Sequence, residues 1–221
     1  MIPWQEVGRA NVSGGDLVLS RRGDEFAIRL RGAELMNSRA HQSEELLATL
    51  GCKPFREAPG VRVLIGGLGM GFTTRAALGA LPADARIEVA ELIPEVVAWN
   101  RGPLADLAGR PLDDPRVTVT VTDVAKVIGQ ADGSLHAILL DVDNGPDAFT
   151  APGNAALYGA PGLKRARRAL IRGGILAVWS VEDDKAFTGR LTGVGFAVEQ
   201  HKVAPRTGSG ARHVLWIAKA P

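Results

Sequence analysis

The distribution of apolar and polar residues predicts alternating strands and helices from residue 61 onward. Short continuous apolar runs are typical of buried parallel strands, and segments with apolar residues every three or four positions are typical of amphipathic helices. The runs predict strands at residues 61–65, 86–90, 117–121, 135–140 and 175–179. The periodic segments predict helices at residues 72–81, 94–107, 124–128 and 154–171. We expect Gly173 and Gly174 to end the last of these helices before the fifth strand.

The end of the chain breaks this alternation. Residues 183–191 predict one more helix, and two β-prone runs, 196–203 and 213–218, follow it. A segment rich in Gly and Arg joins the two runs, which is typical of an antiparallel pair. Strand–helix repeats closed by such a pair predict a mostly parallel, seven-stranded sheet in an α/β, Rossmann-like class I methyltransferase fold.

The first 58 residues have a different pattern. Two β-prone runs, residues 16–20 and 25–30, flank the turn at residues 21–24 and predict a β-hairpin. Residues 38–50 predict a helix. We therefore expect an N-terminal hairpin and helix extension, residues 1–58, and a nucleotide-binding domain, residues 59–221.

A glycine-rich turn follows the first strand of the nucleotide-binding domain. Its glycines are Gly66, Gly67, Gly69 and Gly71, and Glu91 follows at the end of the next strand. Glycines let the chain turn sharply and let a ligand approach the backbone closely. A carboxylate at the tip of the second strand can accept hydrogen bonds from both hydroxyls of a ribose. This arrangement predicts a site for an adenosine-bearing small molecule.

Further acidic residues stand at the predicted ends of the third and fourth strands. Asp123 follows the third strand, and Asp141, Asp143 and Asn144 follow the fourth. Ligands of parallel α/β sheets bind at the carboxyl ends of strands, so these side chains face one crevice. Asp123 either holds the exocyclic amine of adenine or caps a helix. A carboxylate at Asp141 or Asp143 could act as a general base, whereas Asp143 and Asn144 could instead only initiate the turn that follows.

Composition narrows the classes of function. The chain has 221 residues, a formal net charge of +2, and a single cysteine, Cys52, which can form no internal disulfide and has no evident metal-ligand companion. Charges of both signs are interspersed, and no apolar run approaches the ~18 residues of a membrane span. We expect a cytoplasmic protein with a small-molecule partner and no nucleic acid, membrane or metal.

On these residues the chain resembles the spermidine synthase-like aminopropyltransferases. The shared features are the turn at Asp24, the helical segment that carries His41, the glycine loop, the strand ends with their acidic residues, and Tyr158 after the fourth strand. The resemblance implies that S-adenosylmethionine or its decarboxylated form is the co-substrate. It implies roles for Glu91 at the ribose, Asp123 at adenine and Asp141 in catalysis. It also implies substrate contacts from His41, Asn144 and Tyr158, a role in polyamine biosynthesis, and a homodimer.

The chain departs from the pattern of that family at three places. Gly69 stands where the family has an aspartate, the stretch from Asp141 to Asn144 is shortened, and Ala40-His41-Gln42 replaces Tyr-His-Glu. These changes predict an altered active site. Methyl transfer from S-adenosylmethionine, a non-catalytic nucleotide-binding relative and an NAD(P)-dependent oxidoreductase remain alternatives, although the glycine spacing differs from that of dinucleotide-binding enzymes.

Overall fold

A seven-stranded sheet forms the centre of the larger part of the chain. The computed structural model describes residues 2–142, 157–204 and 212–221. The strand order is β10-β11-β9-β8-β5-β6-β7, in which the strands from β9 to β7 are parallel and β11 is antiparallel to both of its neighbours. The strands are β5 (Arg62–Gly66), β6 (Arg86–Glu91), β7 (Val117–Val121), β8 (Leu135–Leu140), β9 (Leu170–Ser180), β10 (Ala197–Val203) and β11 (His213–Lys219). The predicted fold class is therefore confirmed, including the closing antiparallel pair.

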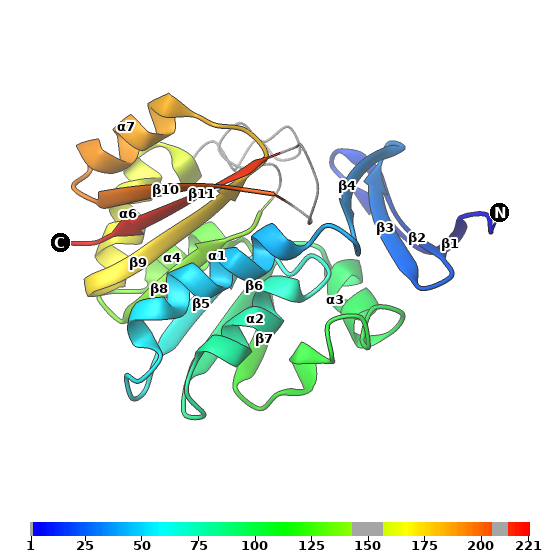
Figure 1. Cartoon of the computed structure of the whole chain (residues 1–221), viewed down its shortest axis with the longest axis horizontal. Helices are drawn as coiled ribbons and strands as arrows, with labels where there is room; N and C mark the ends of the chain where they lie inside the picture. Colours follow the sequence, from blue (N-terminus) through cyan, green and yellow to red (C-terminus); the bar gives the residue numbers. More distant parts are fainter. Residues whose placement is uncertain (1, 143–156, 205–211) are drawn as a thin grey trace.

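Helices cover both faces of this sheet (Figure 1). They are α1 (Gln42–Cys52), α2 (Phe72–Ala80), α3 (Pro94–Arg101), α4 (Val124–Gln130), α6 (Ala160–Ala169) and α7 (Lys185–Gly193), with short 3-10 turns at Lys53–Phe55 and Pro111–Asp113. Side chains alternate along the strands: Val63 and Ile65 pack with α1, α2 and α3, whereas Leu64 packs with α4, α6 and α7. The continuous apolar runs in the sequence follow from this burial on both faces.

The N-terminal part forms a four-stranded antiparallel sheet, with the order β1-β2-β3-β4, and not a simple hairpin. Its strands are β1 (Gln5–Val12), β2 (Gly15–Arg22), β3 (Glu25–Leu30) and β4 (Ala33–Asn37). The predicted hairpin corresponds to β2 and β3. The outer strands carry mostly exposed or half-buried residues and join the sheet through backbone pairing, so the sequence lacks the alternation that would predict them.

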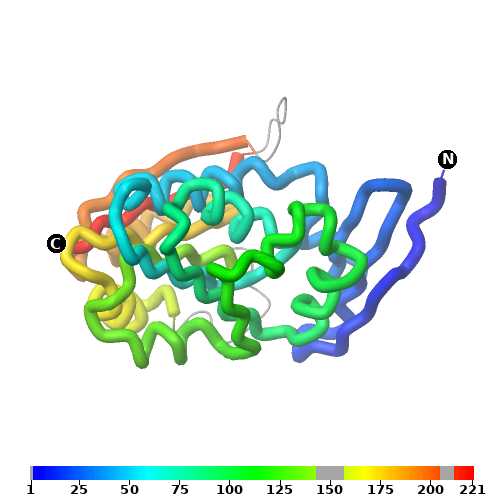
Figure 2. The backbone as a smooth tube through the Cα atoms, turned by 90° about the horizontal axis from the view of Figure 1, so that it is seen from below, coloured from blue at the N-terminus to red at the C-terminus, as the bar shows by residue number. Residues whose placement is uncertain are grey.

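The N-terminal sheet lies at one end of the molecule, and the C terminus lies at the opposite end (Figures 1 and 2). The division at residue 58 stays a prediction. Helix α1, which it assigns to the extension, packs against α2 and against β8, β9 and β11 of the central sheet. In the described residues, no helix is long and apolar enough to cross a membrane.

Two predicted boundaries are wrong for identifiable reasons. Helix α3 ends at Arg101, because Gly102 and Pro103 interrupt it before residue 107. Strand β9 begins at Leu170, so Gly173 and Gly174 lie inside a strand and do not end a helix. Gly173 has a positive φ of 75° and accompanies an irregular register between β8 and β9.

Close contact between Gly8 and Trp99 fixes the N-terminal sheet against α3. A Cβ atom on Gly8 would lie 2.4 Å from Nε1 of Trp99, whose side chain is buried. We therefore expect Gly8→Ala to lower the free energy of unfolding by about 1–3 kcal/mol. Gly79→Ala in α2, where a new Cβ meets nothing within 4 Å, is the control. Urea unfolding measures both, and equal stability of the two variants would contradict the contact.

Candidate functional site

The glycine loop is held between two strands. Gly67 N–H donates to the carbonyl of Ala90 on β6 at 2.9 Å, and the Asp141 N–H donates to the carbonyl of Gly66 on β5 at 2.9 Å. Gly67, Gly69 and Gly71 have positive φ values of 85°, 52° and 87°. A Cβ on Gly67 would lie 2.3 Å from the carbonyl oxygen of Asp141. Glycine is thus required at Gly67 by both backbone conformation and space.

The side chain of Asn100 on α3 forms a hydrogen bond with the backbone of this loop. Its side-chain amide donates to the carbonyl of Gly69 at 2.8 Å and to that of Val96 at 3.0 Å. Asn100 is buried on α3. Sequence reasoning missed this residue, and the signal it could have used is a single amide on the apolar side of a predicted helix.

Glu91 ends β6 and is 7% exposed. Its Oε2 accepts the Leu68 N–H at 2.8 Å, and its Oε1 accepts the Ile93 N–H at 2.9 Å. Two backbone donors therefore orient the carboxylate and link it to the glycine loop. A carboxylate oxygen can accept more than one hydrogen bond, so this arrangement still suits the hydroxyl groups of a ligand.

Asp123 serves as a helix cap and also lines the cavity described below. Its Oδ1 accepts the Ala125 N–H at 2.8 Å at the start of α4. The structure thus shows the helix cap, which uses only part of the accepting capacity of the carboxylate, and the role at adenine stays a prediction.

Asp141 follows β8 and contacts the first turn of α2. Its Oδ2 accepts the hydroxyl of Thr73 at 2.5 Å. Burial raises the pKa of Asp141 to about 6, and the Thr73 hydrogen bond opposes this rise. A carboxyl with this pKa is mostly ionised at pH 7 and can accept a proton there.

A second carboxyl group, that of Glu44, lies near Asp141. Burial raises the pKa of Glu44 well above its ordinary value, and the charge of Asp141 raises it further. Oε2 of Glu44 is buried and has no hydrogen-bond partner within the described parts of the chain. Sequence reasoning missed both Glu44 and Thr73, because only the packing of α1 and α2 brings them to the end of β8.

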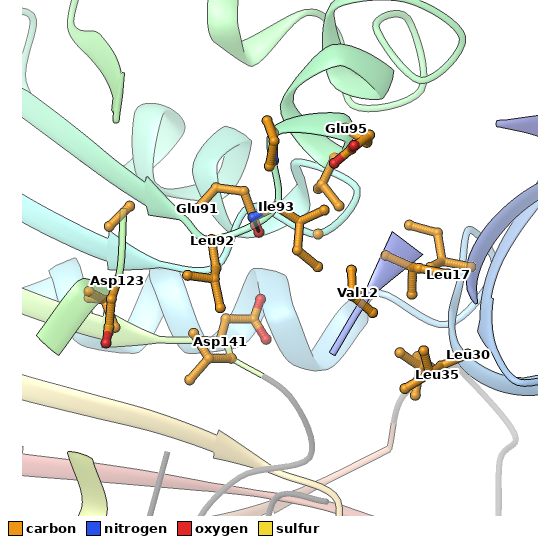
Figure 3. A pocket seen from close by; sticks show the side chains of 18 of the residues that line it. Val12, Leu17, Leu30, Leu35, Glu91, Leu92, Ile93, Glu95, Asp123 and Asp141 are labelled. Atoms are coloured by element: carbon orange, nitrogen blue, oxygen red, sulfur yellow. Dashed lines mark hydrogen bonds between the residues drawn. The ribbon is translucent and has the colours of Figure 1, made fainter. Parts of the chain in front are cut away.

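Glu91, Asp123 and Asp141 meet at a cavity of about 500 Å³ between the carboxyl edge of the central sheet and the N-terminal sheet. Figure 3 shows Asp123 at one end, Val12, Leu17, Leu30 and Leu35 at the other, and Asp141 and Leu92 between them. The lining residues are Asn11, Val12, Ser13, Leu17, Ile28, Leu30, Leu35, Met36, Gly67, Gly69, Ala90, Glu91, Leu92, Ile93, Pro94, Glu95, Val96, Thr122, Asp123, Val124, Asp141 and Val142.

Four further predicted site residues within the described part of the chain are not among this lining. His41 stacks on Phe72 with ring centroids 4.1 Å apart, and its Nδ1 is 3.2 Å from Glu45 Oε1. Tyr158 is 1% exposed and packs edge-on against Phe187 on the opposite face of the sheet. Gly66 and Gly71 belong to the strand end and the helix start beside the cavity. Asp143 and Asn144 lie outside the described residues.

Within residues 2–142, 157–204 and 212–221, no three His, Cys, Asp or Glu side chains are grouped to hold a metal ion.

No family model and no curated protein matches the sequence. The fold, by contrast, matches solved structures over nearly the whole chain, and the matches are structures of spermidine synthases. A spermidine synthase from Thermotoga maritima aligns with a TM-score of 0.78 at 18% identity, covering 98% of this chain and 73% of that one. A spermidine synthase in complex with the transition state analogue AdoDATO aligns with a TM-score of 0.77 at 16% identity, with the same coverage.

A third structure, a probable spermidine synthase from Corynebacterium glutamicum, aligns with a TM-score of 0.65 at 17% identity, covering 99% of this chain and 80% of that one. Identities this low show a common fold. The resemblance to spermidine synthase-like proteins is thus confirmed at the level of the fold.

Replacing Asp141 by Asn is expected to stabilise the protein at high pH. The pKa of this carboxyl rises from its ordinary 3.8 to about 6 on folding, so burial of its charge destabilises the fold increasingly above about pH 4 and fully above about pH 6. At roughly 1.36 kcal/mol per pKa unit, Asp141→Asn should raise the free energy of unfolding by about 2–3 kcal/mol at pH 8. The gain should shrink below pH 6 and nearly vanish near pH 4, where the carboxyl is protonated when folded and increasingly when unfolded.

Urea unfolding at pH 4, 6 and 8 measures this gain. Asp132→Asn changes an exposed carboxylate, 85% accessible at its side chain, and serves as the control. A gain that is the same at all three pH values would show that the charge of Asp141 is not its cause.

Proposed function

We propose that this protein is a transferase that binds S-adenosylmethionine or decarboxylated S-adenosylmethionine and transfers an aminopropyl group to an amine. The observation that carries the proposal is the meeting of Glu91, Asp123 and Asp141 at one cavity beside the glycine loop. Support for the aminopropyl donor comes from the shared fold of spermidine synthases, one of them in complex with the transition state analogue AdoDATO.

The residues at the cavity fit an adenosyl group. Glu91 is preoriented by two backbone N–H groups and can accept hydrogen bonds from the ribose hydroxyls. Asp123 can accept from the exocyclic amine of adenine. Gly67, which has no room for a side chain, leaves the loop backbone open to the ligand.

Asp141 would perform the proton transfer. The donor supplies an electrophilic carbon next to its sulfonium. As the acceptor nitrogen forms its bond to that carbon and the carbon–sulfur bond breaks, Asp141 would take up the proton that the nitrogen loses. The hydrogen bond from Thr73 holds the Asp141 carboxylate in place for this role.

Methyl transfer is the second candidate, and Gly69 is the observation that favours it. A Cβ on Gly69 would stand 3.4 Å from Sδ of Met36, so an apolar thioether borders the place where the resembling family carries a carboxylate. The aminopropyl tail of decarboxylated S-adenosylmethionine carries an ammonium group and no carboxylate. Among the described residues of the loop, that ammonium would lack a charged partner.

Other roles stay as alternatives. An assay of product formation by the unchanged protein and by Asp141→Asn tests whether the protein is a non-catalytic relative. Product that forms with the unchanged protein and disappears with Asp141→Asn would exclude that alternative. NAD serves as the ligand control for an oxidoreductase. Homodimer formation also stays a prediction; the outer edge strands β1 and β4 of the N-terminal sheet are open to pairing.

Isothermal titration calorimetry tests the nucleotide site. We expect binding of S-adenosylmethionine, its decarboxylated form or methylthioadenosine, and none of NAD. Glu91→Gln should weaken binding by at least about tenfold, because it removes charge-assisted hydrogen bonds to the ribose. Glu88→Gln on the same strand, outside the cavity lining, is the control. Absence of binding by every adenosyl compound would refute the proposal, and the preferred tail would indicate aminopropyl or methyl transfer.

The rate should depend on the ionisation of Asp141. Because the pKa of its carboxyl is about 6, we expect kcat/KM for the acceptor to fall below pH 6 by about tenfold per pH unit. Rates measured with saturating donor between pH 5 and 8 test this. A rate that stays constant down to pH 5 would assign the proton transfer to another group.

A further inference from the structure

The cavity has two chemically different ends. Asp123, Glu91 and Asp141 provide carboxylates at the strand ends of the central sheet. The opposite end is walled by aliphatic side chains of the N-terminal sheet (Figure 3). These are Val12, Leu17, Ile28, Leu30, Leu35 and Met36.

Four of the six side chains in this aliphatic wall are only partly buried. Val12, Leu30, Leu35 and Met36 are only half-buried, and Leu92, which stands between the two ends, is 60% exposed. Binding becomes more favourable when an apolar ligand group covers apolar surface in a cavity and removes it from water. The wall therefore favours a ligand with a hydrocarbon portion.

Within the described parts of the chain, the N-terminal sheet itself offers no charged partner for a cation at this end. Among the described residues that the N-terminal sheet contributes to the lining, the polar ones are Asn11 and Ser13, and none is charged. An ammonium group placed against Leu30 and Leu35 would lose its hydration without gaining a partner. One further carboxylate of the described lining, Glu95, lies on the first turn of α3.

We propose that the acceptor is a primary monoamine with an apolar tail, its nitrogen at Asp141 and its tail along Leu30, Leu35 and Met36. This inference rests on the proposed function, because an adenosyl group held by Glu91 and Asp123 leaves the end at the N-terminal sheet for the second substrate. An α,ω-diamine fits this cavity less well, since its second ammonium would face the aliphatic wall.

Calorimetry with the full chain saturated with methylthioadenosine tests the proposal. The probes are n-butylamine, n-pentylamine and n-hexylamine, together with 1,4-diaminobutane and 1,6-diaminohexane. Affinity for the monoamines should rise about three- to fourfold per methylene, which corresponds to ~0.8 kcal/mol for each buried CH₂. Each diamine should bind at least about tenfold more weakly than the monoamine of equal length.

The two proposals fail in different ways. If no adenosyl compound binds, methylthioadenosine included, the proposed function falls and this inference falls with it. If methylthioadenosine binds but diamines bind better than monoamines, the inference alone is wrong, and Glu95 becomes the candidate partner of the second ammonium. Affinity that is independent of chain length would likewise overturn it.

Leu35→Asp provides an independent check, because it places a carboxylate in the wall. It should reverse the preference, so that 1,6-diaminohexane binds better than n-hexylamine. Val7→Asp, at an exposed position of the same sheet outside the lining, should leave the preference unchanged. If Leu35→Asp does not fold, the amine series on the unchanged protein still decides the matter.

Discussion

The passage of the backbone through Gly66 and Gly67 is the constraint on which the site depends. There the chain leaves β5 between β6 and β8, with one hydrogen bond to each neighbour and a gap too small for a Cβ atom. This close approach sets the ends of three parallel strands at a common level. As a result, Glu91 at the end of β6 and Asp141 directly after β8 both lie beside the glycine loop.

Glu91, which we propose binds the ribose, is itself tied to this backbone constraint. Its carboxylate accepts N–H groups from Leu68 in the loop and from Ile93 before α3, while Asn100 holds the same loop through the carbonyl of Gly69. The carboxylate of Glu91 therefore also helps to fix the conformation of the glycine loop. Its orientation is fixed before any ligand arrives, which lowers the entropic cost of binding.

The sequence was informative where local patterns determine structure. Strands β7 and β8 were predicted residue for residue, since β-branched or apolar runs lie between clear turns. Glu91, Asp123 and Asp141 were placed at one site because parallel strands end at the same edge. The edge strands β1 and β4 gave no such pattern. Thr73 and Glu44 could not be foreseen, because their proximity to Asp141 depends on how helices pack against the sheet. Asn100 has a sequence signal, a single amide on the apolar side of a predicted helix, but its contact with the glycine loop also depends on that packing.

The two-sided character of the cavity follows from the two sheets that build it. Strand ends of a parallel sheet leave backbone groups to be satisfied, and polar residues such as Glu91 and Asp123 collect there. An antiparallel sheet instead presents one apolar face, and Leu17 and Ile28 belong to the face that β2 and β3 turn inward. Because that apolar face lies opposite the strand ends, the cavity is polar at one end and apolar at the other. It is therefore complementary to a ligand, or a pair of ligands, with the same two-ended character.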